Sequence, residues 1–184
     1  MATTSANARI FGSDNDAVYI APLGTTLPTD LGALDPAFVD AGWLSTDGIT
    51  VTPSDSVEKF RGHQGGRVVR TKITESDTTF QFQTLETTAL ALGLQFDVTN
   101  AASNGGVTTL DVSSGRSVAA RAIVIDVFDE DVQYRFVVER AEIGERSEFS
   151  LANNAITGYT FTVEVIDEMT IITDDPAAAA LAGS

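Results

Sequence analysis

The segment with the most unusual chemistry is Lys59–Lys72, which reads Lys-Phe-Arg-Gly-His-Gln-Gly-Gly-Arg-Val-Val-Arg-Thr-Lys. It holds five of the eleven Lys and Arg residues and the only histidine, but no acid. The rest of the 184-residue chain therefore carries six bases against 26 acids, a charge of −20. Two regions of opposite charge favour head-to-tail association of identical subunits, in which this basic segment meets an acidic surface of the next copy.

Other interpretations of the basic segment stay open. Its bases can pair inside the subunit with flanking acids, namely Asp55, Glu58, Glu75 and Asp77. Nucleic-acid binding is disfavoured, because Phe60 is the only aromatic residue of the segment and the net charge of the chain is −15. The glycines around His63 match neither common phosphate-loop spacing, so they predict a flexible hairpin loop. The expected inter-subunit contacts are Lys59, Arg61, His63, Arg67, Arg70 and Lys72.

Residues suited to catalysis or metal binding are scarce. The absence of cysteine and the single histidine exclude disulfides, thiolate catalysis and paired-histidine metal sites. The acidic runs Asp14–Asp16 and Asp129–Asp131 lack the spacing of a calcium loop, so we expect solvated turns there. No G-x-S-x-G motif is present. The sequence therefore predicts no enzyme, no catalytic or metal site and no cofactor.

Trp43 is the only tryptophan and stands at the apolar start of an expected strand. The simplest interpretation makes it a core residue or an anchor in an inter-subunit contact. A surface that stacks on a sugar ring is the alternative.

Composition predicts a single folded domain. Hydrophobic residues make up 43% of the chain and charged residues 20%, and the mean hydropathy is +0.07. No apolar run is long enough for a membrane helix and no secretion signal is visible, so we expect a soluble chain synthesised in the cytoplasm. We expect a flexible segment over 1–14, one domain over 15–173 that includes an irregular arm over 22–56, and a mobile tail over 174–184.

Period-2 alternation predicts a mainly β fold, a two-sheet antiparallel sandwich with one flanking helix. The clearest strands are 77–85 and 157–167, whereas 118–128 contains a run that is apolar on both faces and is placed centrally. Strand 132–140 should form a tight hairpin with it. Shorter strands are expected at 17–21, 42–45, 49–51, 57–61, 67–75, 108–112 and 170–173. The one helix is predicted over 85–94, capped by Thr84, with Leu85, Ala89 and Leu92 docked on a sheet.

Two rows of polar side chains lie on the outer faces of these strands. They consist of Gln133, Arg135 and Glu139, and of Thr160, Thr162 and Glu164. An ordinary solvent face and the lining of an assembled channel are both compatible with this pattern.

Four stretches together resemble a known family: 21–31 of the arm, the strand Ala-Gly-Trp-Leu-Ser-Thr-Asp-Gly over 41–48, the loop exit Gln-Gly-Gly-Arg-Val-Val-Arg-Thr over 64–71, and the helix over 85–94. In order and spacing they are similar to the major tail proteins of long, non-contractile-tailed phages, particularly those of actinobacteria. The resemblance covers roughly residues 15 to 170.

The resemblance implies a virion tail tube subunit that forms hexameric rings. The rings stack into a hollow tube through which DNA passes without specific binding. One sheet of each subunit would join its neighbours into the inner wall, lined by the two polar rows, and a loop over about 45–70 would reach the adjoining ring. The implied partners are the chain itself, a tape measure protein, and tail terminator and tip proteins, with no membrane. The alternative function is a β-sandwich binding module, either a capsid decoration protein or a glycan-binding adhesin.

Overall fold

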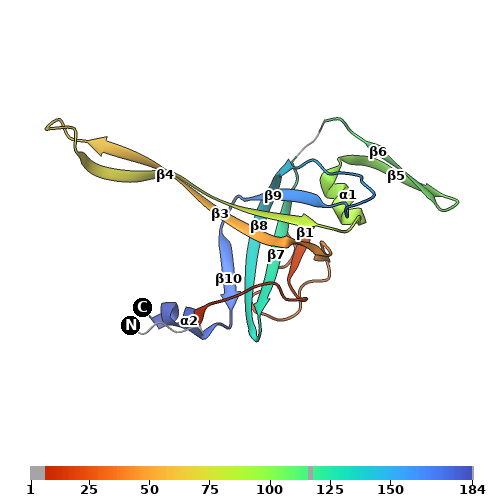
Figure 1. The fold of residues 1–184 in the computed structure, drawn as a ribbon, viewed down its shortest axis with the longest axis horizontal. Coiled ribbons are helices and arrows are strands. Elements are labelled where there is room, and N and C mark those ends of the chain that lie inside the picture. Colours follow the sequence, from red (N-terminus) through yellow and green to blue (C-terminus); the bar gives the residue numbers. More distant parts are fainter. Residues whose placement is uncertain (1–6, 116–117, 184) are drawn as a thin grey trace.

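The computed structural model describes residues 7–115 and 118–183, and antiparallel strands dominate it (Figure 1). The strands are β1 (Ala17–Pro22), β2 (Val39–Asp40), β3 (Leu44–Arg61), β4 (Val68–Thr84), β5 (Val98–Asn104), β6 (Val107–Val112), β7 (Ala120–Asp129), β8 (Val132–Arg146), β9 (Tyr159–Val165) and β10 (Met169–Thr173). The helical elements are α1 (Ala89–Gln95), α2 (Pro176–Ala179) and the 3-10 turn η2 (Ala180–Gly183).

The large sheet has eight strands in the order β2-β1-β7-β8-β9-β4-β3, with β10 also paired to β8. The first half of β8 pairs with β10 and its second half pairs with β9, so the sheet changes neighbours along this one strand. Strands β5 and β6 form a second, two-stranded sheet. The predicted mainly β fold with antiparallel sheets in a sandwich-like arrangement is confirmed, although two helices are present instead of one and strand β5 was not expected.

The main core follows the predicted alternation. Phe80 and Phe82 of β4 and Phe161 of β9 are almost fully buried, and the rings of Phe82 and Phe161 lie 5.7 Å apart. The β7 run over 122–125 is buried on both faces, as predicted for a central strand. The expected turn between β7 and β8 is also confirmed, because Asp129 pairs directly with Val132 across a two-residue connection.

A second, smaller core lies on the other face of the sheet and is covered by the arm. Phe38 of the arm is buried against Val124 of β7 and Val137 of β8, with Leu27 and Leu34 beside it. We expected an irregular arm with only brief strands as far as residue 56. That expectation is wrong from Leu44 onward, because β3 begins there and continues to Arg61. The first part of the arm packs on its own subunit.

Strands β3 and β4 form one long hairpin that projects from the body (Figure 1). The four short strands predicted between residues 42 and 75 are therefore wrong as separate elements, whereas the predicted strand 77–85 is the inner part of β4. Pro53 lies inside β3 and pairs with Thr78, which is tolerated because β3 is an edge strand and its outer backbone groups need no partner in the sheet. Gly48, with φ of 67°, lies within a register shift of the ladder, so it bends the strand without ending it.

Helix α1 begins later than predicted. Its N-cap is Thr88, whose hydroxyl accepts a hydrogen bond from the backbone N–H of Ala91 at 3.1 Å. The predicted cap, Thr84, is buried and instead donates its hydroxyl to the carbonyl of Ala41 at 2.7 Å. The buried helix residues are Ala91, Leu94 and Gln95, so the expected docking stripe is also wrong.

Candidate assembly surfaces

The basic segment lies at the tip of the β3–β4 hairpin, about as far from the core as the chain reaches (Figure 1). The side chains of Lys59, Arg61, Arg67, Arg70 and Lys72 are all exposed, and so is His63. Apart from a hydrogen bond of Arg61 to the carbonyl of Gly66, none of the five bases makes a polar side-chain contact with the described chain. The charges of the tip are therefore available to another molecule.

The alternative of pairing inside the subunit is not supported. Glu58 lies directly across from Lys72 in the ladder, yet no oxygen–nitrogen distance within 4.0 Å joins them. Glu75 instead accepts a hydrogen bond from the hydroxyl of Ser56. The hairpin brings acids and bases close in sequence but does not neutralise the tip.

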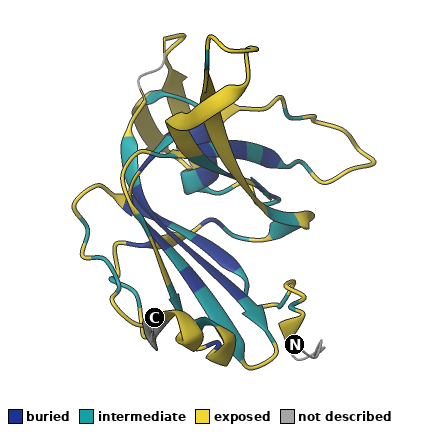
Figure 2. Cartoon of the chain, turned by 90° about the vertical axis from the view of Figure 1, so that its left-hand side faces the viewer, coloured by how far each residue is buried: buried dark blue, intermediate teal, exposed yellow. Residues whose placement is uncertain are grey.

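The outer half of the hairpin has no core of its own. Every residue from Val51 to Arg61 and from Val68 to Asp77 is exposed, and these include the apolar side chains of Val57, Phe60 and Ile73 (Figure 2). A two-stranded ribbon with both faces in water is marginally stable by itself. This part of the chain gains apolar burial only through contact with a partner.

The polar row on β9 is continuous with polar residues of β4. Gln81 donates its amide to the hydroxyl of Thr162 at 3.2 Å, and Gln83 donates to Thr160 at 3.1 Å. We call these four residues, together with Glu164, the polar ladder. Sequence analysis included the three β9 residues in the candidate lumen face and missed the two glutamines, although their alternation with Phe80 and Phe82 carried the signal.

The second predicted polar row does not face solvent as a unit. Arg135 is only 4% exposed and forms a bidentate ion pair with Asp126, with both nitrogen–oxygen distances at 2.7 Å. Its remaining guanidinium nitrogen donates to the carbonyls of Asp30 and Gly32 in the arm. The hydrogen bond with Asp126 is the main reason that the pKa of Arg135 is raised. The expectation that Arg135 is lumen-facing fails because the arm covers this part of the sheet. Gln133 is half-buried beside it, whereas Glu139 is exposed.

Trp43 is not a core residue, because its side chain is 71% exposed. Its backbone is nevertheless held on both sides: the N–H donates to Oε1 of Glu86 at 3.0 Å, and the carbonyl accepts from the N–H of Leu85 at 2.7 Å. A large aromatic ring is thus presented to the outside from a fixed backbone. This geometry fits the predicted role of an interface anchor and leaves that role a proposal.

Comparison with known proteins assigns the family. The sequence matches the family model of the phage tail tube protein over residues 2–180. The chain belongs to the phage tail tube protein family. A tail tube protein is a structural component of the virion tail, as the resemblance implied. No curated protein matches the sequence.

Solved structures similar to this tail tube protein come from several particles. A chain of the anti-feeding prophage baseplate has 12% identity and a TM-score of 0.49, covering 94% of this chain and 97% of that one. A chain of the sheath–tube complex of an extracellular contractile injection system has 11% identity and a TM-score of 0.47, covering 92% and 98%. A chain of the native gene transfer agent virion has 10% identity and a TM-score of 0.46, covering 87% and 97%.

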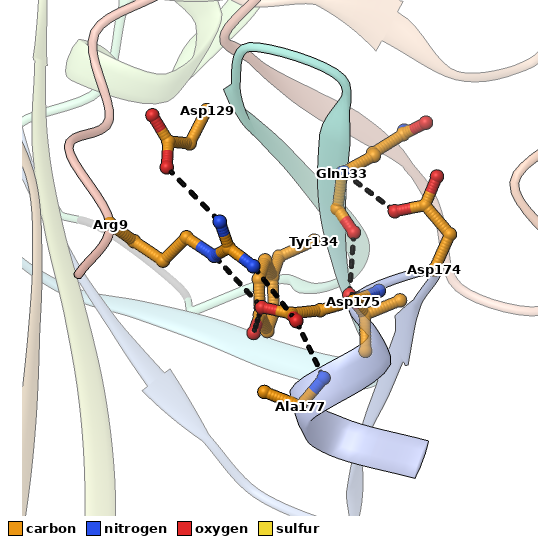
Figure 3. Close-up of polar contacts among 8 residues, drawn as sticks. Arg9, Asp129, Gln133, Tyr134, Asp174, Asp175 and Ala177 are labelled. Carbon is orange, nitrogen blue, oxygen red and sulfur yellow. Dashed lines mark hydrogen bonds and ion pairs between the residues drawn. The ribbon is translucent and has the colours of Figure 1, made fainter. Parts of the chain in front are cut away.

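The two ends of the tail tube protein are tied together by a polar cluster that sequence analysis missed (Figure 3). Arg9 contacts both carboxylate oxygens of Asp175 at 2.9 Å and lies 3.6 Å from Asp129. The hydroxyl of Tyr134 donates to the same aspartate at 2.6 Å. Asp175 also caps α2 by accepting from the N–H of Ala177. We call Arg9, Tyr134 and Asp175 the terminal clasp.

The terminal clasp changes the expectation for both chain ends. Of the segment predicted as flexible, residues 1–6 lie outside the described residues, while Arg9 is bound and Phe11 packs edge-on against Tyr134. The predicted mobile tail contains a buried residue, Asp175, and continues into α2 and η2. Hydrogen bonds from Arg9 and Tyr134 lower the pKa of Asp175 far below its ordinary value, and the bond to Asp175 is the main cause of the raised pKa of Tyr134.

Among the described residues of the tail tube protein, no helix is long and apolar enough to cross a membrane.

Proposed function

We propose that this chain is the major subunit of a phage tail tube, in which hexameric rings stack into a hollow tube for passage of DNA into the host. The role is structural and needs no catalytic site and no cofactor. The family match supports a tube subunit, and the ring number and the passage of DNA come from the family resemblance. The observation that carries the proposal is the β3–β4 hairpin, a basic, two-sided exposed ribbon on an otherwise acidic body.

The hairpin supplies the contact between rings in this proposal. Its apolar side chains lose water when they meet a neighbouring subunit, and its five bases meet acids there. Contact also relieves a second problem, because β3 is an edge strand with unpaired backbone groups along its length. A ribbon of this kind is stable and protected only in an assembly.

The polar ladder supplies the inner wall of the tube. Gln81, Gln83, Thr160 and Thr162 are neutral and Glu164 is acidic, so the row contains no Lys or Arg. Each basic contact to a phosphate would release counterions and add affinity for DNA. A wall of amides, hydroxyls and carboxylates instead leaves the DNA hydrated and free to slide.

Other proteins of the tail complete the proposed assembly. By family resemblance these are a tape measure protein inside the tube, and terminator and tip proteins at its ends.

Among the polar positions first considered for the lumen, Glu139, Thr160, Thr162 and Glu164 stay candidates, and Gln133 is half-buried.

Electron microscopy of the concentrated protein tests the proposal. We expect hollow tubes, or sixfold rings in end-on views. Reversing Arg67 and Arg70 to Glu should leave a folded monomer that does not stack, because both side chains are exposed and neither forms an ion pair in the described chain. Arg140→Gln, which removes a base of the body together with its exposed ion pair to Glu142, is the control and should assemble normally. A protein that stays monomeric at every salt and protein concentration would contradict the proposed function, and normal tubes from the double variant would contradict the role of the hairpin.

A further inference from the structure

An open groove lies at the base of the hairpin, between the start of β3 and the segment before β1. Its volume is about 860 Å³. Its floor is formed by Phe80, Ile125 and Phe136, which belong to or pack against the main core. The exposed ring of Trp43 is part of its wall. Because Phe80 and Ile125 are almost fully buried, the apolar surface that another molecule can reach in the groove comes mainly from Phe11, Trp43 and Val51.

The charged residues of this groove are all acidic. They are Asp14, Asp16, Asp40, Asp47 and Glu86, and no Lys, Arg or His among the described residues lines the groove. None of the five carboxylates takes part in an ion pair of the described chain. An apolar floor with an uncompensated acidic rim selects a ligand that carries both apolar groups and positive charge.

We propose that this groove receives the basic hairpin tip of a second copy of the chain, an inference that rests on the proposed tube function and names the receiving site. The tip has the complementary chemistry. Phe60 and Val69 are 45% and 74% exposed, and the five unpaired bases surround them. The apolar side chains fill the floor while the bases face the acidic rim.

The tip cannot reach the groove of its own subunit. The antiparallel ladder runs from the pair Ile49 and Phe82 at the groove to the pair Arg61 and Val68 at the tip. At about 3.3 Å per residue, the part of β3 between Ile49 and Arg61 spans roughly 40 Å. Only another copy can place its tip there. A contact between two different surfaces of identical subunits forms a ring where the rotation between copies closes and an open stack where it does not, and the second case is the one that the proposed stacking uses.

Trp43 is placed to act as the anchor of this contact. Its backbone is fixed by Glu86 and Leu85 before any partner arrives, so little conformational freedom is lost on docking. Exposed aromatic residues presented in this way carry a large share of interface energy. As the only tryptophan, Trp43 also reports occupation of the groove through its fluorescence.

The test uses two full-length variants with opposite defects. In the groove variant, Asp14→Lys and Asp47→Lys leave a rim of three acids and two lysines, so its charge falls from −5 to −1. Neither carboxylate makes a hydrogen bond in the described chain, so folding should be unaffected. In the tip variant, Arg67→Glu and Arg70→Glu leave three bases and two acids, so the charge of the tip falls from +5 to +1. Each variant alone loses most of the charge attraction at the contact and sets its new side chains against like charges, so the protein concentration needed for assembly should rise at least about tenfold. Asp131→Lys with Glu168→Lys, two exposed acids outside the groove, is the matched control and should assemble as the wild type does.

Mixing the two variants gives the decisive result. The new glutamates on the tip of one variant now meet the new lysines in the groove of the other, and the unchanged tip of the groove variant fits the unchanged groove of the tip variant. We expect the mixture to regain assembly, seen by sedimentation, together with a blue shift of the Trp43 emission. Circular dichroism of each variant confirms folding.

Two outcomes overturn the assignment of the groove: assembly of the groove variant at wild-type concentration, or a mixture of two folded variants that stays monomeric. Failure of the proposed function is distinguishable from these. If the wild type forms no tubes but the mixture sediments as complexes larger than a monomer, the groove assignment stands and the tube function falls.

Discussion

The strand pair β7–β8 and the outer half of the hairpin β3–β4 are both antiparallel ladders, and they differ in what covers them. Strand β7 is buried on both faces, by the main core on one side and by the arm on the other. The outer hairpin is covered on neither face (Figure 2). Backbone pairing is common to the two, so pairing alone does not make a ladder stable in water. The body completes its packing inside one chain, whereas the hairpin requires a second.

Substituting one phenylalanine in each region tests this difference in burial most directly. Phe161 is fully buried in the body and Phe60 is 45% exposed near the hairpin tip. Phe161→Ala should lower the free energy of unfolding by about 3–5 kcal/mol, because it removes a large buried ring and leaves a cavity. Phe60→Ala should change it by less than about 1 kcal/mol and should weaken assembly instead. Denaturant unfolding of the monomer measures both values, and similar losses for the two variants would remove the distinction between the regions.

The arm provides the second comparison, because Arg135, which is fixed by its ion pair with Asp126, holds the arm on the body through hydrogen bonds. Arg135→Ala leaves Asp126 buried without its partner and releases the arm carbonyls of Asp30 and Gly32. We expect a loss of about 3 kcal/mol, at the low end for a broken buried pair because the opened arm admits water to the carboxylate. Limited proteolysis should then cut within residues 23–37. The exposed Arg67→Ala serves as the control. An arm that stays resistant to protease in Arg135→Ala would contradict this role of the ion pair.

The terminal clasp should make a smaller, pH-dependent contribution to the free energy of unfolding. Because Arg9 and Tyr134 lower the pKa of Asp175 in the folded state, the stability that this carboxylate contributes is fully present above the ordinary carboxyl pKa. It is lost progressively as the pH falls below about 4, where the unfolded chain takes up a proton and the folded chain does not. Unfolding midpoints between pH 2 and pH 7 should therefore fall less steeply toward acid in Asp175→Asn than in the wild type. Asp131→Asn is the control, and equal slopes for the wild type and Asp175→Asn would show that the clasp carries no such linkage.

Much of the body was predictable from local pattern. The alternation around Phe80 and Phe82, the two-sided apolar run over 122–125 and the acidic turn after it all indicated elements that the structure contains. These predictions succeed because successive side chains of a strand point to opposite faces, so the alternation of apolar and polar residues in the sequence shows which side chains are buried. The polar ladder was visible in the same way on the opposite face of β4 and β9.

The hairpin was misjudged because glycine and proline signals are ambiguous at an edge strand. In a central strand, residues such as Gly48 and Pro53 would interrupt the pairing. At the edge, Gly48 lies in a bulge, and the backbone N–H that Pro53 lacks has no neighbouring strand to pair with. The predicted start of α1 was also wrong. Thr84 is buried with its hydroxyl donated to the carbonyl of Ala41 at the end of β4, and Thr88 caps the helix four residues later.

The sequence by itself determined the β class, the central strands and the separation of a basic segment from an acidic chain, because these depend on residue type and spacing. Only the tertiary structure decided which polar residues are free. Arg135 and Asp175 look like surface charges in the sequence. Asp175 is nevertheless buried against Arg9 near the other end of the chain, and Arg135 is buried between Asp126 of the adjacent strand and the carbonyls of Asp30 and Gly32 in the arm. The five bases of the tip look able to pair with nearby acids and remain unpaired, because a ladder extending into solvent has no neighbouring element to supply them with partners.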